Sequence, residues 1–451
     1  MMVEFALYAQ LVLFAAIAIG FFFHRNSSIF HPLAFYLLFH GIVFVIRPFM
    51  VHYLNFEGRW VYMQYRPTDN EFVFTLFVTS VGLVVFALTS WLMGNVEVKF
   101  TAGDLPEFTP AQKRGLLITL LLLGPLATYS AFFATGDIGL YERGDIQMTM
   151  DLATGNAIYV NTTGYIVDAQ TMFGSLAVLF MWRFRFAWWT WFPLILFMAY
   201  RAFLGGGRWA MITVVFTIIL VQLYRSRRRW IRLRYLGLMI PLFILFQNIG
   251  FDRNYFRDMV SGEGRVVAEF RDNRSWLEKQ DNPDFANFDF LTYILWAVPD
   301  KSRTYTYFSQ YLQLFTEPIP RILWPDKPVG SPIKLINLND FGNFVGLTNS
   351  LVGDGWLSGG WVGLLVTMIA VGLAFGYIHR RFWRVSQPYK VIMYCGFMPL
   401  TLLWFRDGGI SLAKYTLFVL LPILVWIWTS SLLERFGQLS ANSRPQILRR
   451  R

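Results

Sequence analysis

Windows of about 20 apolar, nearly uncharged residues recur along this chain of 451 residues, and they restrict its fold more than any other feature. A helix of that length crosses the hydrocarbon core of a bilayer. Hydrophobic residues make up 55% of the chain and charged residues only 15%, whereas soluble domains carry about a quarter of charged residues. We therefore expect an all-α, polytopic helical membrane protein.

The apolar windows predict about eleven transmembrane helices and one large loop that carries short helices. The expected spans are 4–23, 31–51, 71–94, 115–134, 159–182, 187–204, 208–224, 235–250, 358–378, 390–405 and 411–432. The chain then divides into residues 1–250 with the first eight spans, the loop 251–357 with active-site elements, and residues 358–451 with three spans and a basic tail.

The basic segments between spans predict the orientation of the chain. "RSRRRWIRLR" after the seventh span and "RPQILRRR" in the tail fall on the same side, which the positive-inside rule makes cytoplasmic. The N-terminus is then outside and the C-terminus inside. The net charge of +12 follows from this topology and from attraction to membrane lipids, so we expect no nucleic-acid partner.

Several common catalytic motifs are missing from the sequence. It has no Walker A loop, GxSxG, HExxH or paired DxD motif, and its single cysteine, Cys395, lies in an apolar segment. None of the five histidines falls in the large loop. We therefore expect no cofactor, no metal and no nucleotide, and activity that survives EDTA.

Charged residues within or at the ends of spans need a polar cavity or a partner, because an unpaired charge at membrane depth costs several kcal/mol. For Arg47, a functional role and a side chain that snorkels to the interface are both open. In "LGGGRW", three glycines allow a sharp reversal beside Arg208, although an ordinary glycine-rich turn is the alternative. The residues concerned are Arg47, Asp168, Arg201, Arg208, Arg406, Asp407 and Lys414.

The segment "FRDGG" at 405–409 places an arginine, an acid and two glycines between the last two spans. Arg406 and Asp407 could pair with each other. Neighbouring positions on a helix do not face one another, so we expect these two side chains to have separate partners.

The loop 251–357 contains eleven Lys and Arg against fourteen Asp and Glu, so its cations are not a topology signal. Five prolines stiffen the stretch "PIPRILWPDKPVGSP" at 318–332, which presents Arg321, Trp324 and Lys327. Arginine and lysine bind phosphate oxygens and a tryptophan face can stack on a sugar. The alternative is an interfacial anchor with aromatic-belt tryptophan and snorkelling cations.

The order of these motifs resembles a known family. "GGGR" between paired spans, "PRILWPDKP" in the loop, "LVGDGWLSGGWVG" leading into a span and "RDGG" between the last spans are similar to the Wzy-type O-antigen and exopolysaccharide repeat-unit polymerases, over about 201–414. The resemblance implies a glycosyltransferase of the bacterial inner membrane that joins undecaprenyl-diphosphate-linked oligosaccharides on the periplasmic face. A chain-length regulator and a flippase are its candidate protein partners.

The charges and the resemblance together predict the site residues. The expected catalytic residues are Arg208, Arg321, Arg406, Asp407 and Asp354, with Asp252 as another carboxylate that could orient the acceptor. The expected diphosphate-binding residues are Arg253, Arg257, Arg303, Lys327 and Arg201. The expected glycan-binding residues are Trp209, Trp324 and Trp356.

Other functions stay open at this point. O-antigen ligases, related lipid-linked transferases, rely on a periplasmic histidine that the loop 251–357 lacks, which favours a polymerase. A polysaccharide transporter would carry polar residues at mid-membrane in both halves, whereas here they gather toward one face. A scaffold protein would tolerate neutralisation of Arg208 and Arg406.

Overall fold

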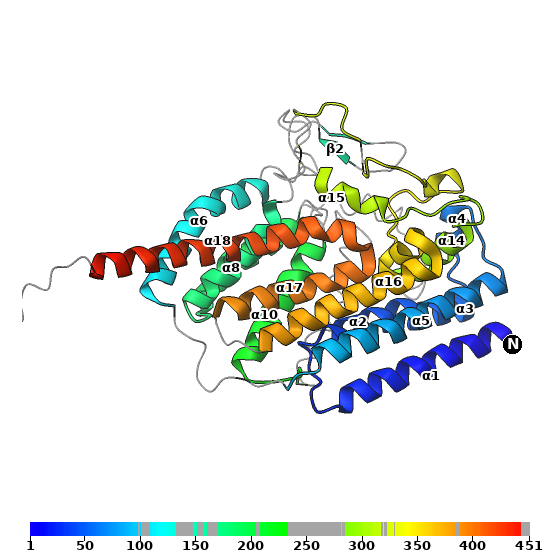
Figure 1. The fold of residues 1–451 in the computed structure, drawn as a ribbon, viewed down its shortest axis with the longest axis horizontal. Helices are drawn as coiled ribbons and strands as arrows, with labels where there is room; N and C mark the ends of the chain where they lie inside the picture. Colours follow the sequence, from blue (N-terminus) through cyan, green and yellow to red (C-terminus); the bar gives the residue numbers. More distant parts are fainter. Residues whose placement is uncertain are drawn as a thin grey trace, which may run out of the picture.

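The structure is a computed structural model of the chain (Figure 1). It describes residues 1–97, 100, 108–131, 148–150, 157–159, 169–203, 208–232, 281, 285–316, 319, 323–328, 330–383 and 388–442.

Helices dominate the described residues. The N-terminal half contains α1 (Met2–Phe23), α2 (Pro32–His40), the π-helix η1 (Gly41–Ile46), α3 (Arg47–Leu54), α4 (Gly58–Met63), α5 (Asp69–Gly94), α6 (Pro110–Tyr129), the 3-10 helix η4 (Ala169–Thr171), α8 (Met172–Arg183), the 3-10 helix η5 (Trp188–Trp191), α9 (Phe192–Phe203) and α10 (Arg208–Arg225). The C-terminal half contains α14 (Asn287–Ala297), the 3-10 helix η9 (Ser309–Leu312), α15 (Gln313–Thr316), the 3-10 helix η10 (Leu338–Asp340), α16 (Ser350–Trp383), α17 (Pro388–Asp407) and α18 (Gly409–Asn442).

The predicted helical membrane-protein fold is confirmed at this level. Five helical stretches are long and apolar enough to cross a membrane: Met2–Phe23, Pro32–Leu54, Asp69–Gly94, Ser350–Trp383 and Tyr415–Phe436. Met211–Arg225 is a shorter apolar helix. The one departure from an all-α chain in the described part is a short antiparallel pair of strands, β1 (Met148–Met150) and β2 (Ala157–Tyr159).

The remaining predicted spans have different outcomes. Helices α6 and α17 overlap the predicted spans 115–134 and 390–405, but neither is among the five stretches that are long and apolar enough to cross a membrane. In the described part of the spans predicted at 159–182 and 187–204, helices α8 and α9 have 12 residues each, too few to cross a bilayer alone. The span predicted at 235–250 lies outside the described residues.

Local sequence explains where the long helices begin. Thr68 precedes α5, and its hydroxyl accepts from Glu71 N while the Glu71 carboxylate accepts from Thr68 N at 2.7 Å. Thr109 and Gln112 make the same reciprocal pair before α6, where Pro110 takes the first helical position. Each pair satisfies backbone donors that the first helical turn leaves open.

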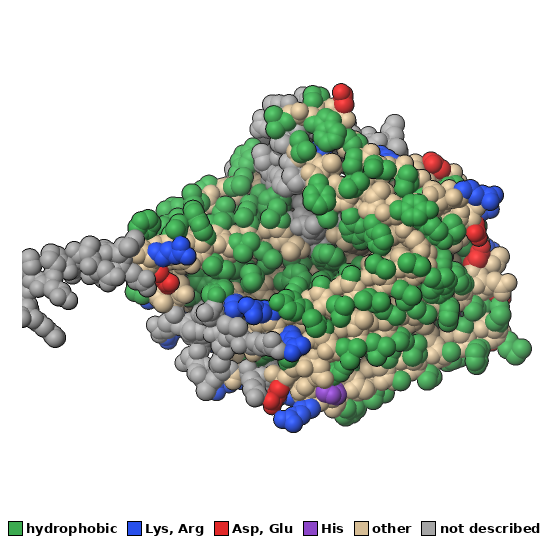
Figure 2. Space-filling view, viewed as in Figure 1, with side chains coloured by type: hydrophobic (Ala, Val, Ile, Leu, Met, Phe, Trp, Pro, Cys, Tyr) green, Lys and Arg blue, Asp and Glu red, His purple; other side chains and the backbone are tan. Residues whose placement is uncertain are grey.

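Hydrophobic side chains cover the flank of the bundle, and the charged side chains lie mainly toward its ends and upper edge (Figure 2).

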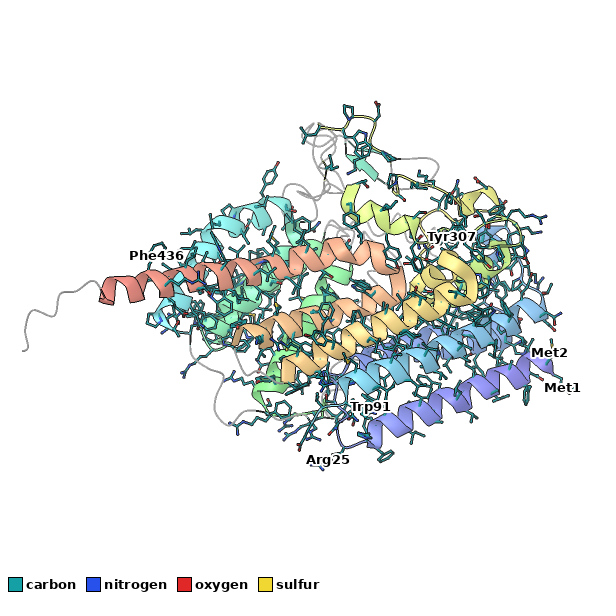
Figure 3. The ribbon with its side chains drawn as sticks, in the orientation of Figure 1. Met1, Met2, Arg25, Trp91, Tyr307 and Phe436 are labelled. Atoms are coloured by element: carbon teal, nitrogen blue, oxygen red, sulfur yellow. The ribbon has the colours of Figure 1, made fainter. Side chains whose placement is uncertain are left out.

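Two basic segments meet at one end, where Arg229 Nη1 donates to Arg25 O at 2.6 Å and Ile29 N donates to Arg229 O at 2.9 Å. Arg25 and Met1 mark opposite ends of α1 (Figure 3). The first and seventh predicted spans therefore end together.

Helix α16 is two helices joined by a sharp reversal. Gly359 and Gly360 leave helical geometry, and Gly360 has a φ of 59°. Residues 350–358 fold back on the long helix 361–383, so closely that a Cβ on Gly363 would lie 2.3 Å from Gly355 O. The glycines of "GDGWLSGGWVG" thus permit a helical hairpin, in which the second helix matches the predicted span 358–378.

Candidate active site at the junction of α16, α17 and α18

Asp354 lies on the short first helix of α16 and is 1% exposed. Its carboxylate accepts from Gly409 N at 2.8 Å, from Asn349 Nδ2 at 3.2 Å and from the Tyr311 hydroxyl. Gly409 opens α18, so this carboxylate receives a backbone donor that the helix start leaves unpaired. The two motifs "LVGDGW" and "RDGG" therefore meet in the fold.

The backbone conformation at position 408 explains why a glycine follows Asp407. Its φ is 85°, a left-handed conformation that costs other residues about 1–2 kcal/mol. A Cβ at this position would also lie 2.1 Å from Asp354 Oδ2. Only glycine combines this backbone turn with the approach of the buried carboxylate.

Tyr311 connects the loop to this junction. Burial and the neighbouring Asp354 carboxylate raise the pKa of Tyr311, so its phenol keeps its proton and donates to Asp354. Gln310 is next to it and donates from Nε2 to Ser358 Oγ at 2.7 Å. The segment 310–311 therefore packs over the first helix of α16 and the start of α18.

Arg406 and Asp407 end α17 beside this buried carboxylate. Arg406 Nη1 lies 3.3 Å from Asp407 Oδ1, and the two side chains are 15% and 16% exposed. The two side chains therefore pair with each other where α17 ends, which is the arrangement that the sequence left open as the alternative. Asn287 Nδ2 on α14 donates to Arg406 O at 2.8 Å. We call Asp354, Arg406, Asp407, Gly408 and Gly409 the junction site.

The junction site combines chemical groups of two kinds. Asp354 is buried and accepts three hydrogen bonds, which suits a structural anchor. Arg406 and Asp407 are partly exposed, so a guanidinium and a carboxylate lie next to each other in the junction. A guanidinium can bind phosphate oxygens in a bidentate way, and a carboxylate can orient a hydroxyl.

Trp356 has a different environment from the one expected for a glycan platform. It is 5% exposed, and its Nε1 donates to Val298 O at 2.8 Å. Its ring packs against Phe74 and Trp361. These contacts make Trp356 a packing residue of the helical hairpin.

The described part of the proline-rich loop forms a tight turn. Lys327 N donates to Trp324 O at 3.1 Å, and Lys327 Nζ donates to Ile319 O at 3.0 Å. The lysine side chain therefore helps to close this turn. Trp324 is half-buried, and Arg303 is exposed on the surface.

Other predicted site residues cannot be placed in the junction. Arg321, Arg253, Arg257, Asp252 and Asp168 lie outside the described residues. Arg201 lies in α9, Arg208 and Trp209 open α10, and Lys414 lies in α18. The side chains of these last four residues also lie outside the described part.

Arg47 is neither exposed nor snorkelling. Its side chain is 1% exposed, and Arg47 Nη2 lies 2.5 Å from Asp289 Oδ2 and 2.7 Å from Asp281 Oδ1. The snorkelling alternative is therefore wrong. This arginine forms a buried ion pair with a carboxylate 242 residues away in the sequence.

Sequence reasoning missed the neutral polar residues around the junction. Asn287, Asn349 and Tyr311 donate the hydrogen bonds that hold it. The charged residues were selected because burying a charge in a membrane is costly, and this criterion does not select uncharged residues. Asn349 lies two residues before the motif "LVGDGWLSGGWVG", and Tyr311 lies in the loop stretch "TYTYFSQYLQLF", whose aromatic and apolar spacing suggests a helix. That stretch is only partly helical, as η9 and α15.

Comparisons with known proteins give no indication of the function of this chain. No protein-family model, no curated protein and no solved structure matches this chain. Within the described ranges, no three His, Cys, Asp or Glu side chains gather in a way that could hold a metal ion.

Proposed function

We propose that this chain is a membrane glycosyltransferase that joins polyprenyl-diphosphate-linked oligosaccharides, and in particular a repeat-unit polymerase. The observation that carries the proposal is the partly exposed Arg406 and Asp407 pair, anchored by buried Asp354 at a helix junction. This pair offers a cation for a diphosphate and a carboxylate for a hydroxyl in one place, in a chain with several membrane-type helices.

The reaction forms one glycosidic bond and breaks one bond to the diphosphate. The acceptor hydroxyl attacks the anomeric carbon of the donor, loses its proton, and polyprenyl diphosphate leaves with the electron pair of the broken C–O bond. Arg406 stabilises the charge that develops on the leaving group; removing one such donor commonly costs about 3–4 kcal/mol of transition-state stabilisation. Asp407 orients the acceptor hydroxyl and receives its proton.

Asp354 has a supporting role in this scheme. Its carboxylate accepts from Gly409 N and Asn349 Nδ2, which leaves it little capacity to accept an acceptor proton. It fixes the start of α18 and so the direction of Asp407. Asp407 is therefore the favoured carboxylate.

Further cations and tryptophans complete the proposed substrate path. We propose that the diphosphate is also contacted by Arg208, Arg321, Arg253, Arg257, Arg201, Arg303 and Lys327. Trp324 and Trp209 are the proposed stacking residues for sugar, while the buried Trp356 is left out of this set.

The membrane setting is part of the same proposal. We propose about eleven spans in a bacterial inner membrane, with the N-terminus and the loop 251–357 in the periplasm and the C-terminus in the cytoplasm. The meeting of the basic segments around Arg25 and Arg229 supports one basic face. The donor and acceptor then reach the junction site from the outer leaflet.

The test is the length of the lipid-linked glycans in cells. A strain that lacks the chain is complemented with wild type, Arg406→Ala or the control Arg66→Ala, whose side chain is 75% exposed and pairs with Glu57. We expect a ladder with wild type and with Arg66→Ala, and single repeat units with Arg406→Ala.

Two other outcomes would change the assignment. An intact lipid-linked ladder that no longer reaches its final acceptor in Arg406→Ala would identify a ligase or another lipid-linked transferase. A wild-type ladder and normal transfer in Arg406→Ala would remove the junction site from the chemistry and reopen the transporter and scaffold functions.

A further inference from the structure

Helix α14 is a short helix from the predicted loop that lies inside the helical bundle. It is 11 residues long, and each of them is buried apart from the half-buried Trp296. It contacts α4, α5, α16 and η1. A buried helix of this length is held by the polar residues of its first turn, Asn287 and Asp289, as well as by apolar packing.

The polar residues of this first turn bind partners on two different sides. Asp289 accepts from Arg47, which begins α3 at the end of the second predicted span. Asn287 Nδ2 donates at 2.8 Å both to Arg406 O and to Thr348 Oγ1. One turn of helix therefore connects a buried ion pair with the backbone of the junction site.

The ion pair is well suited to fix α14 in one place. Arg47 and Asp289 are 1% and 0% exposed, and Asp281 provides a second carboxylate at 2.7 Å. Two carboxylates on one fork of donors define both the distance and the orientation of the helix. A buried arginine without these partners would be strongly destabilising, so the arrangement has little freedom to shift.

We propose that Arg47 and Asp289 are positioning residues for the junction site, and that they act through Asn287 on the backbone of Arg406. The ion pair holds the start of α14, and Asn287 then holds the carbonyl of Arg406 near the end of α17 so that Arg406 and Asp407 point into the site. This inference rests on the proposed function for its catalytic meaning, but its structural content can be tested separately.

The structural test uses a cysteine reporter. Cys395, the single cysteine of the chain, is buried, and Cys395→Ala with Asp407→Cys leaves one thiol at the junction site. The rate at which this thiol reacts with a small charged methanethiosulfonate reagent is measured in four proteins. These are the Cys395→Ala, Asp407→Cys chain itself, the same chain with Arg47→Lys, with Asn287→Ala, and with both substitutions. Arg47→Lys keeps the charge and removes the fork of donors, so the chain retains its buried ion pair.

The expected result is a change of the same sign in each single variant, about tenfold in rate, and no further change in the double variant, because coupled residues are not additive. The control Gln10→Ala removes another buried polar contact, to Thr79 at 2.8 Å between α1 and α5, and leaves the rate unchanged. An unchanged rate in Arg47→Lys, or effects that multiply in the double variant, would overturn the proposal.

The kinetic test is made on chains with Asp407 intact. Arg47→Lys is expected to lower kcat for glycosyl transfer by about 10- to 100-fold at little change in KM, since a misplacement of about 1 Å has effects of that size. A changed KM with unchanged kcat would contradict positioning. If the chain has no transferase activity, the proposed function fails, and the cysteine reporter still decides whether Arg47 sets the junction.

Discussion

Two glycine pairs reverse the chain in the C-terminal part, and they have different surroundings. Gly359 and Gly360 connect the two helices of α16, where the chain is held by neutral contacts such as Thr306 N to Leu357 O at 2.7 Å. Gly408 and Gly409 connect α17 to α18, where a buried carboxylate accepts the backbone donor. Partly exposed Arg406 and Asp407 flank only the second pair.

The difference shows what a glycine pair can indicate. Both pairs predict a reversal because glycine tolerates left-handed backbone and close approach. Chemistry requires in addition charged groups that are fixed and reachable by a ligand. The first pair is therefore a packing device, and the second is the proposed reacting site.

The largest expected effect on folding is that of Gly408→Ala. The new Cβ would meet Asp354 Oδ2 in a left-handed backbone position, and strain plus overpacking is expected to cost about 2–5 kcal/mol of unfolding free energy. Gly346→Ala is the control, since Gly346 has a φ of 73° with open space around it. Thermal unfolding in detergent measures both; equal losses would show that the Asp354 contact is unimportant.

Gly363→Ala tests the packing pair in the same way. Its Cβ would press on Gly355 O, and we expect a loss of about 1–3 kcal/mol of unfolding free energy with the activity per folded molecule preserved. Gly20→Ala, at an open position in α1, serves as the helical control. Loss of activity without loss of stability in Gly363→Ala would move the chemistry to the hairpin.

Trp356→Phe distinguishes packing from glycan binding. The variant loses the donor to Val298 O, which is expected to cost about 1 kcal/mol of unfolding free energy. We expect KM for the lipid-linked acceptor to stay within about twofold, since the variant changes binding by far less than the ~1.4 kcal/mol that a tenfold change needs. A raised KM at unchanged stability would return Trp356 to the glycan site.

EDTA is expected to have the smallest effect. Arginines carry the leaving-group charge in the proposed scheme, so the transfer rate should stay the same after chelation. The rate is measured on purified protein before and after EDTA. A loss that Mg²⁺ restores would show that a metal, and not Arg406 alone, neutralises the diphosphate.

The sequence predicted the type of fold better than the details of the site. Apolar windows located α1, α5 and the later part of α16 because length and hydropathy dictate a spanning helix. The meeting of "GDG" and "RDGG" is a long-range contact, and no local pattern shows it. The same holds for Arg47, whose partner Asp289 could not be identified by charge alone.

The measurement that decides most directly uses purified protein in liposomes with a polyprenyl-diphosphate-linked oligosaccharide. The Tm values of wild type and Asp407→Asn are first measured to show that both proteins are equally stable. The lengths of the lipid-linked products of each protein are then followed over time. The proposed function predicts lengthening with wild type. It predicts that Asp407→Asn lowers the rate of lengthening by at least about 100-fold. Equal lengthening by both proteins, or no lengthening by wild type, would contradict it.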